Sequence, residues 1–339
     1  MIKIGVDANG GDFGVETTVP GAILALNKID DLEIVFYGDE EKIKPLLKEC
    51  DMKRISIVHT KVTMDMGEHD PVRAVRKMKD SSLDMVMYAA KNKEIDGVVT
   101  SGPTQCVVMA AHLIVRRLEC MERVALCPIM TNYDGKPRLI LDVGANVELK
   151  IEHLGQFAIF ATVAAKEILG IENPTVGLLN IGSEPGKGRE QEKLAYDYLA
   201  NLNHINFYGN VEPNEIINCP TNIVVCDGFS GNIAVKTLEG TAKTMGVMLK
   251  DEIKSSLFGK IGYLFMRKNL ARFKKRMSSD EVGGAMILGV SAPVVKAHGN
   301  SNAYAYSNAI YQVYNMVKKD LINKVLEKLP KEEGKENEW

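Results

Sequence analysis

Ser230 is the residue whose surroundings first suggest chemistry, because it lies between two glycines directly after an apolar run, in VVCDGFSGN. A serine on a sharp turn between a strand and a helix is the nucleophile of many hydrolases, and that turn requires the pattern Gly-x-Ser-x-Gly. Here Gly231 follows the serine immediately, one residue too early for the pattern. Two interpretations stay open, a nucleophile or a loop that binds another group.

Five further segments resemble this one, since each has an apolar run followed by polar residues and glycine. The six segments are VDANGGD (6–12), VVTSGPT (98–104), LDVGAN (141–146), LLNIGSEPGKG (178–188), VCDGFSGN (225–232) and AHGNSN (297–302). Glycine lets backbone N–H groups approach an anion closely, and a helix N-terminus favours negative charge. We expect these loops to share one edge of a parallel sheet and to form a pocket for a phosphate-like group. The alternative is that they are tight turns, with Asp7, Asp142 and Asp227 only capping helices or loop amides.

Two side chains near these loops carry charge that could act on a phosphate. Lys187 lies among glycines, so it either binds phosphate or is a solvated surface charge. His298 could act as acid, base or donor, or could form a structural hydrogen bond to backbone. GSEPGKG lacks the spacing of the Walker loop, and DANGGDFG lacks the Gly-x-Gly-x-x-Gly spacing of dinucleotide sites. An ordinary kinase or NAD enzyme is therefore disfavoured.

Short β-branched runs that alternate with helical segments must position these residues. The expected strands are Ile2–Val6, Glu33–Tyr37, Ile55–His59, Gly97–Thr100, Val124–Pro128, Leu139–Leu141, Val176–Asn180, Asn206–Tyr208 and Ile223–Cys226. The expected helices include Glu40–Glu49, Val72–Lys79, Ser82–Lys91, Ile151–Leu169, Glu190–Asn201 and a last helix from about Asn302 to Leu329. Continuous apolar strands between helices are typical of a mostly parallel sheet covered on both faces. We predict a Rossmann-like α/β sandwich, as one large domain over residues 1–330 and a charged tail over 331–339.

The segment from about 232 to 277 predicts a protruding helical hairpin inserted into this domain, with a break at Gly259 and Gly262. Nine basic residues lie between Lys250 and Arg276, and apolar residues recur near helical spacing. A basic amphipathic segment can lie on an anionic bilayer or dock an acidic partner, and packing in a dimer is the alternative. The residues expected to make the membrane or partner contact are Leu257, Phe258, Phe265, Arg267, Lys268 and Arg272.

Composition limits the function classes further. Of the 339 residues, 45% are hydrophobic and 25% charged, as in soluble globular proteins, and a net charge of -2 gives no field for nucleic acid. The six cysteines form no C-x-x-C pair, which favours reduced thiols in a cytoplasmic protein. We expect no metal and no cofactor. We also expect no transmembrane helix, because no apolar stretch approaches about 20 residues.

Several of these segments together resemble one family. LDVGAN, GLLNIGSEPGKG, FYGNVEP, VVCDGFSGNIAVKTLEG, EVGGA and APVVKAHGNSNA stand in the order found in the bacterial acyl-carrier-protein:phosphate acyltransferases of phospholipid synthesis, the PlsX family. The resemblance extends from end to end. It implies transfer of a long-chain acyl group from acyl carrier protein to inorganic phosphate, which yields acyl phosphate. It also implies a homodimer, with a fold related to phosphate acetyltransferases and isopropylmalate-type dehydrogenases.

In that reaction phosphate itself attacks the thioester, so the protein must hold phosphate and stabilise the oxyanion, and Ser230 needs no nucleophilic role. The catalytic candidates are Lys187 for phosphate, Asn232 for the carbonyl oxygen, and His298 for phosphate or the departing thiolate. The phosphate-binding candidates are Asp7, Gly10, Gly11, Asp142, Asn146, Asn180, Gly182, Gly186, Asp227, Gly228, Gly231 and Ser301. Further expected partners are the membrane, at its inner face, and the downstream glycerol-3-phosphate acyltransferase.

The sequence departs from the family at two loops. Asn9 and Phe13 replace the usual Met and His, and residues 100–106 lack the Asn and second Gly of the usual Ser-Ala-Gly-Asn-Thr-Gly-Ala. Donor or chain preference can differ as a result. The alternatives are a short-chain acyl-CoA phosphate acyltransferase and a non-catalytic membrane-associated scaffold, with a dehydrogenase least favoured.

Overall fold

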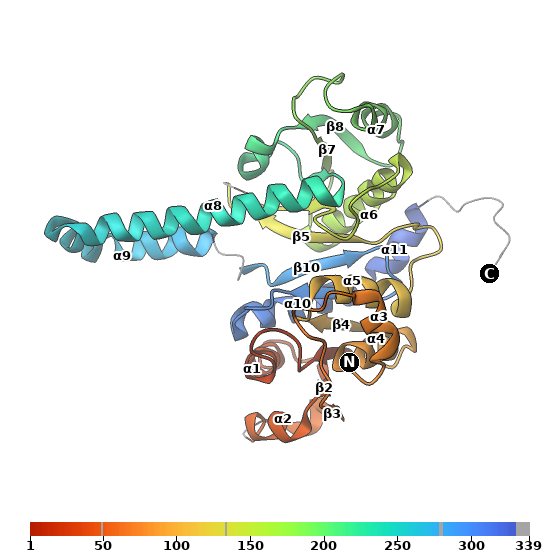
Figure 1. Cartoon of the computed structure of the whole chain (residues 1–339), viewed down its shortest axis with the longest axis vertical. Coiled ribbons are helices and arrows are strands. Elements are labelled where there is room, and N and C mark those ends of the chain that lie inside the picture. The colour runs from red at the N-terminus through yellow and green to blue at the C-terminus, as the bar shows by residue number, and fades with distance from the viewer. Residues whose placement is uncertain (49, 133, 278–280, 330–339) are drawn as a thin grey trace.

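The structure is a computed structural model that describes all residues except 49, 133, 278–280 and 330–339, so the predicted tail lies outside the described residues (Figure 1). Within the described part, eleven strands form one sheet in the order β3-β2-β1-β4-β11-β10-β5-β6-β9-β7-β8. The strands are β1 Ile2–Asp7, β2 Leu32–Gly38, β3 Ile55–His59, β4 Gly97–Thr100, β5 Ala125–Thr131, β6 Pro137–Leu141, β7 Thr175–Leu179, β8 Asn206–Val211, β9 Ile223–Val225, β10 Gly284–Leu288 and β11 Val294–Ala297.

Most neighbouring strands in this sheet are parallel, as predicted, but the direction changes within it. β10 is antiparallel to both of its neighbours, β11 and β5. β5 and β6 then form an antiparallel hairpin, and β9, β7 and β8 continue parallel to β6. The set β6, β7, β8 and β9 therefore runs opposite to the set β1, β4 and β11, and their carboxyl ends lie at opposite edges.

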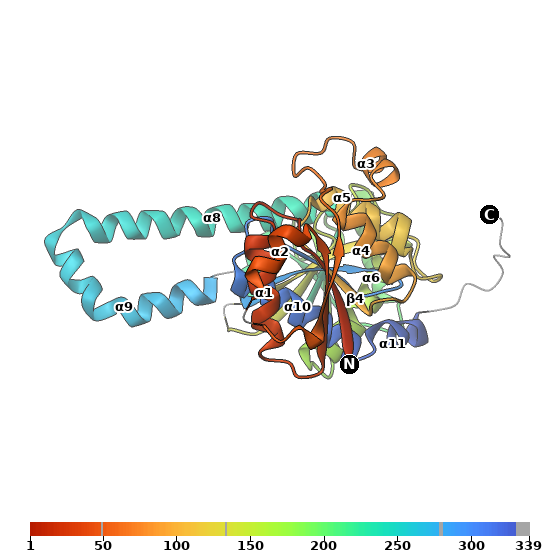
Figure 2. The same ribbon diagram turned by 90° about the horizontal axis from the view of Figure 1, so that it is seen from below.

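Helices cover both faces of the sheet, which confirms the predicted sandwich (Figure 2). The helices are α1 Val15–Leu26, α2 Glu40–Leu46, α3 Pro71–Lys77, α4 Ser82–Lys91, α5 Thr104–Ala110, α6 Ile151–Leu169, α7 Glu190–Ala200, α8 Gly228–Ser255, α9 Leu257–Met277, α10 Ala303–Lys318 and α11 Leu321–Lys328. On one face α1 and α10 bury β1, β4 and β11 in a core that includes Val6, Val295 and Tyr306. On the other face α4 and α5 pack on a second core, with Val98 and Val294.

The predicted helical hairpin is present and protrudes from the sandwich as α8 and α9 (Figures 1 and 2). The turn lies at Ser256, in an extended conformation, and not at Gly259 and Gly262 as predicted. α8 also begins at Gly228, before the predicted Asn232, because the Asp227 carboxylate caps the first turn. Both glycines lie inside α9, where helix formation continues in spite of their low propensity.

The predicted last helix is also two helices, α10 and α11. Asp320 lies between them with φ 51, in the left-handed region. The chain changes direction at this residue, so the apolar face of α11 can pack against α6 and the end of α10, with Leu321 and Val325 buried.

Candidate functional site

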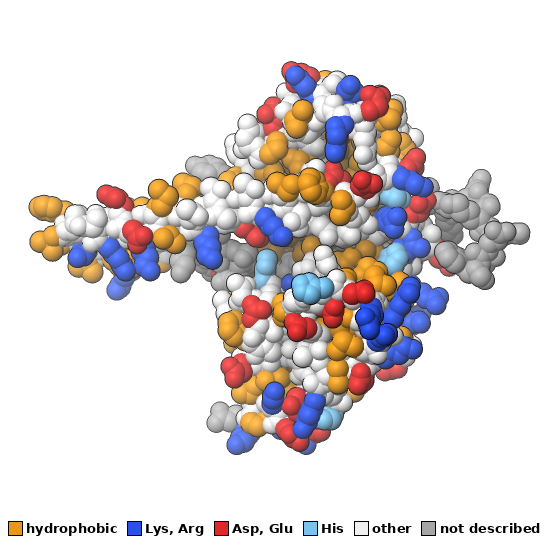
Figure 3. Space-filling view, in the orientation of Figure 1, with side chains coloured by type: hydrophobic (Ala, Val, Ile, Leu, Met, Phe, Trp, Pro, Cys, Tyr) orange, Lys and Arg blue, Asp and Glu red, His pale blue; other side chains and the backbone are white. Residues whose placement is uncertain are grey.

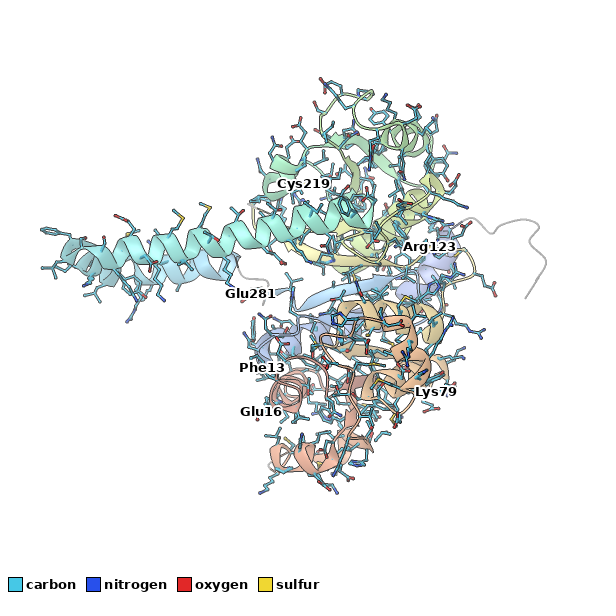
Figure 4. All side chains as sticks on the ribbon, in the orientation of Figure 1. Phe13, Glu16, Lys79, Arg123, Cys219 and Glu281 are labelled. Carbon is cyan, nitrogen blue, oxygen red and sulfur yellow. The ribbon has the colours of Figure 1, made fainter. Side chains whose placement is uncertain are left out.

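The six predicted loops lie at two edges of the sheet, so the prediction of one pocket built from all of them is wrong. Loops 8–14, 101–103 and 298–302 follow β1, β4 and β11 and form what we call the first group. Loops 142–150, 180–189 and 226–227 follow β6, β7 and β9 and form the second group. Figure 4 shows the separation, with Phe13 of the first group on the side of the hairpin and Arg123, beside the end of β6, on the opposite side.

The loops of the first group are held together by hydrogen bonds. The Ser101 hydroxyl donates to the Gly10 carbonyl at 2.9 Å, and the Asp12 N–H donates to the Gly299 carbonyl at 2.9 Å. Gly11 has φ +88, and a Cβ there would lie 2.6 Å from the Ser101 hydroxyl oxygen. Only glycine fits this approach. The structure thus brings five predicted residues together, which are Asp7, Gly10, Gly11, His298 and Ser301.

Two buried carboxyl groups and one partly buried lysine beside the first group have shifted pKa values. Burial raises the pKa of Asp7, although its carboxylate accepts a bond of 2.7 Å from the Thr100 hydroxyl. Burial, with the nearby Asp7 charge, raises the pKa of Asp84 to about 7. Burial lowers the pKa of Lys296 to about 8. Such shifts are concentrated at functional sites. Sequence reasoning missed Lys296 and Asp84, because neither burial nor neighbours can be read from one sequence.

Asp142 is the centre of the second group and is fully buried. One carboxylate oxygen accepts bonds from the N–H groups of Leu126, Gly144 and Ala145 at 2.9–3.1 Å. The other accepts bonds of 2.7 and 2.8 Å from the backbone and side-chain nitrogens of Asn146. Burial raises the pKa of Asp142, and these bonds oppose that effect. Both predicted residues, Asp142 and Asn146, therefore hold the loop together.

Asp227 and Ser230 form the N-terminal cap of α8. The Asp227 carboxylate accepts bonds from the Ser230 N–H at 2.8 Å and from the Ser230 hydroxyl at 2.9 Å. A Cβ on Gly228 or Gly231 would lie 2.2 or 2.0 Å from a loop carbonyl oxygen, so both glycines allow close backbone packing. The Asn232 amide donates to the Val143 carbonyl at 2.8 Å. The serine of the opening motif thus lies in the first turn of α8 and donates both bonds to the residue that caps this helix.

Lys187 lies in an exposed part of the second group. Its backbone carbonyl accepts a bond of 3.1 Å from Asn180, which fixes the loop. Its side chain is 50% exposed, with the ammonium 3.7 Å from the Glu184 carboxylate. Gly182 lies against the Lys187 stem, whereas a Cβ on Gly186 would meet nothing within 4 Å. The predicted phosphate contact of Lys187 stays a prediction, and its ammonium already has an anionic neighbour.

A cavity of about 670 Å³ adjoins the second group. Its lining includes Lys150, Arg189, Asp227 and the exposed Phe229. α6, α7 and α8 all begin at this cavity, so three positive helix ends converge there. Arg189 is paired with the carboxylates of Glu192 and Asp227, the latter at 3.4 Å. Sequence reasoning did not single out Lys150 or Arg189, although each directly precedes a predicted helix.

The hairpin exposes apolar and basic side chains, as the predicted contact requires. Phe258 and Phe265 are 86% and 85% exposed, and Leu257 is 70% exposed. Figure 3 shows hydrophobic side chains gathered at the far end of the hairpin and Lys and Arg along its lower side. The predicted residues Arg267, Lys268 and Arg272 are exposed on α9. No described helix is both long and apolar enough to cross a bilayer.

Nowhere in the described part of the chain do three or more His, Cys, Asp or Glu side chains gather where a metal ion could bind.

Comparison with known proteins places the chain in a family. Residues 2–324 match the family described as "Fatty acid synthesis protein". The chain belongs to the PlsX family.

PlsX relatives match nearly the whole chain. A "Phosphate acyltransferase" of Acholeplasma laidlawii is 47% identical over 327 residues, which cover 96% of this chain and 97% of the relative. A protein of the same name from Bacillus cereus is 41% identical over 331 residues, which cover 98% and 99%.

Solved structures similar to this PlsX chain include a phosphotransacetylase from Streptococcus pyogenes. It has a TM-score of 0.59 at 18% identity, over 95% of this chain and 94% of that one. A branched-chain phosphotransacylase from Enterococcus faecalis has a TM-score of 0.56 at 12% identity, over 94% and 100%. These likenesses confirm the predicted fold.

Proposed function

We propose that this chain transfers a long-chain acyl group from acyl carrier protein to inorganic phosphate, and that the acyl phosphate serves phospholipid synthesis. The similarity to phosphate acyltransferases over nearly the full chain carries this proposal, since membership of the PlsX family supports a phosphate acyltransferase role. The carrier-protein donor and the pathway are the steps that go beyond the family.

The first group of loops is the better candidate for the phosphate-binding site. A phosphate dianion needs backbone N–H groups and a cation that no carboxylate already neutralises. At the second group, Lys187 lies beside Glu184, and Arg189 is paired with Asp227. At the first group, Gly10, Gly11 and Ser301 lie in contacting loops, where α1 and α10 begin. We therefore place the attack on the thioester at the first group.

Lys187→Ala and His298→Ala discriminate between the two groups. We expect His298→Ala to raise the KM for phosphate and Lys187→Ala to leave it within about twofold, because an exposed ion pair contributes little. The opposite result would move the phosphate to the second group, where the predicted Lys187 contact lies.

The hairpin is the surface that we propose for the acidic carrier protein and for peripheral contact with the inner face of the membrane. Its exposed phenylalanines can insert among lipid chains while its basic residues meet anionic groups. This contact would deliver acyl phosphate to the glycerol-3-phosphate acyltransferase. Liposome flotation should show weaker binding for Phe265→Glu than for wild type. Tyr208→Glu, an exposed aromatic on β8, is the matched control, and equal binding of both variants would refute the contact.

The activity itself is tested with palmitoyl acyl carrier protein and phosphate. We expect release of free thiol that depends on phosphate, with acyl phosphate as the product. Faster reaction with acetyl- or butyryl-coenzyme A would favour the short-chain alternative. No acyl phosphate from either donor would leave the non-catalytic scaffold. Analytical ultracentrifugation tests the proposed homodimer.

A further inference from the structure

Lys296 lies on β11 in a row of polar residues across the sheet. In the strand register Lys296 is opposite Thr100 of β4, and Ala285 of β10 lies on its other side. Opposite residues in neighbouring strands share a face, so Lys296 and Thr100 point to the same side of the sheet. The Thr100 hydroxyl donates to Asp7 at the end of β1. The row therefore leads from Lys296 directly into the first group of loops.

The face of the sheet that carries Lys296 has an apolar core to which α5 and the start of α8 both contribute. Val294, two residues earlier on the same face, shares an apolar core with Val107 of α5. Val235 and Leu238 of α8 and Ala285 of β10 pack against that same core. Lys296 itself is only partly buried. Lys296 thus follows this core along β11, and part of its surface is accessible to solvent.

The ammonium of Lys296 has few hydrogen-bond or ion-pair partners for a partly buried cation. It donates to the Ala297 carbonyl at 2.8 Å. Among the described residues, no carboxylate lies within ion-pair distance of it, and Asp12 is the charge that influences it. Burial lowers the pKa of Lys296 to about 8, and the Asp12 charge opposes that effect only in part. Lys187 on the opposite edge has no such setting, since it is exposed and beside Glu184.

We propose that Lys296 is the acid of the acyl transfer, a catalytic residue that gives its proton to the thiolate leaving the acyl donor. This assignment rests on the proposed function. A phosphate oxygen forms a bond to the thioester carbon, and the C–S bond breaks with its electron pair on sulfur. The Lys296 ammonium protonates that sulfur to give the thiol. The neutral amine then recovers a proton from the P–OH group of the newly formed acyl phosphate, so protons balance without a further reactant.

The chemistry of the leaving group favours a lysine in this setting. An ordinary thiol has a pKa of about 8.5, and proton transfer is most effective when acid and base are closely matched. A solvated lysine, with a pKa of about 10.4, is a weaker acid than the thiol it would protonate. Burial lowers the pKa of Lys296 to about 8 and so reduces that mismatch. His298 lies two residues later, in a loop of the first group, and its proposed role is contact with the phosphate.

The test compares two acyl donors that carry the same chain. One is acyl carrier protein, whose thiolate needs a proton, and the other is the 4-nitrothiophenyl ester, whose thiolate is a far weaker base. For Lys296→Met we expect kcat to fall about 10²–10⁴-fold with the carrier-protein donor and to stay within about tenfold of wild type with the nitrothiophenyl ester. Methionine keeps the length and apolar stem of lysine, so the variant should fold.

Lys296→Arg separates acid catalysis from simple charge. Arginine retains the positive charge but does not lose a proton in proteins, so the same donor-dependent loss is expected. Lys53→Met, an exposed lysine in the short helix before β3, should match wild type with both donors. Thermal unfolding of each variant within about 3 °C of wild type shows that the fold is kept.

Several outcomes would overturn the assignment. Lys296 is not the acid if Lys296→Met loses activity equally with both donors, or if it keeps full activity. The assignment is also rejected if Lys296→Arg restores activity while Lys296→Met has a higher phosphate KM. A wild-type protein that releases no thiol in the presence of phosphate would instead refute the proposed function itself, so the two failures are distinguishable.

Discussion

Asp142→Asn should destabilise the protein while leaving the phosphate KM nearly unchanged. The sequence suggested Asp142 as a phosphate-binding residue, but the structure shows its carboxylate fully buried and occupied by five hydrogen bonds. Asparagine has the same shape and retains one acceptor oxygen. Its amide nitrogen would then face either the two donors of Asn146 or the N–H groups of Leu126, Gly144 and Ala145.

The magnitude follows from the bonds that must be lost. At least two charge-assisted bonds disappear, each worth about 1.5–3 kcal/mol, and their donors stay buried. Removal of a desolvated charge offsets part of this, so we expect a loss of about 3 kcal/mol in the free energy of unfolding. Unfolding entropy of about 2.1 cal/mol/K per residue gives about 0.7 kcal/mol/K for a chain of this length. The melting temperature should therefore fall by about 4 °C.

The assay is thermal and urea unfolding, followed by acyl transfer measured well below the melting temperature. Asp197→Asn, an exposed carboxylate on α7, is the matched control and should unfold like wild type. A variant with unchanged stability but a phosphate KM raised tenfold or more would refute this reasoning. It would show that Asp142 faces the substrate and that the second group is the phosphate site.

Three further predictions concern two glycines, Ser230 and Asp84. Gly231→Ala should fold poorly, because its Cβ would lie 2.0 Å from the Asp142 carbonyl oxygen. Gly186→Ala should fold like wild type, because its Cβ would meet nothing within 4 Å, and soluble yield and melting temperature check both variants. Ser230→Ala should keep most acyl transfer activity and lose about 1 kcal/mol of stability, and a trapped acyl-serine would contradict this. Asp84 holds its proton more tightly when folded, with a pKa raised from 3.8 to about 7, so the free energy of unfolding should fall as pH rises through that range. Asp84→Asn should remove that fall in urea titrations, and an unchanged pH slope would reject it.

The strands were predictable because their composition leaves little alternative. Ile55–His59 and Gly97–Thr100 were predicted with the bounds that the structure has, and Ile2–Asp7 extends the prediction by one residue. Buried strands of a parallel sheet are continuous apolar runs bounded by turn residues, so their positions can be read without knowing their neighbours. Helices with a strong apolar periodicity, such as Ile151–Leu169, were equally predictable.

The direction of the strands was the error that changed the site. The sheet was predicted to be mostly parallel, and all six loops were expected at one edge, whereas β5 and β6 form an antiparallel hairpin. The signal was present, because Asp134 and Gly135 lie between the two strands and Asp-Gly is typical of a hairpin turn. The two antiparallel pairs of β10 cancel, so the β5–β6 pair leaves every later strand in the sheet reversed relative to β11. Three of the six loops therefore lie at the far edge.

The choice between the two groups depends on which charges are already satisfied, and a sequence does not contain that information. Lys187 and Lys296 are both lysines near glycine-containing loops. Only the structure shows that the first is half exposed beside Glu184. The second is partly buried, and no carboxylate among the described residues is in ion-pair range of it. Even partial burial of a cation without a neutralising partner is unfavourable for folding. Its retention next to loops suited to an anion is the physical reason to expect that a substrate completes the site.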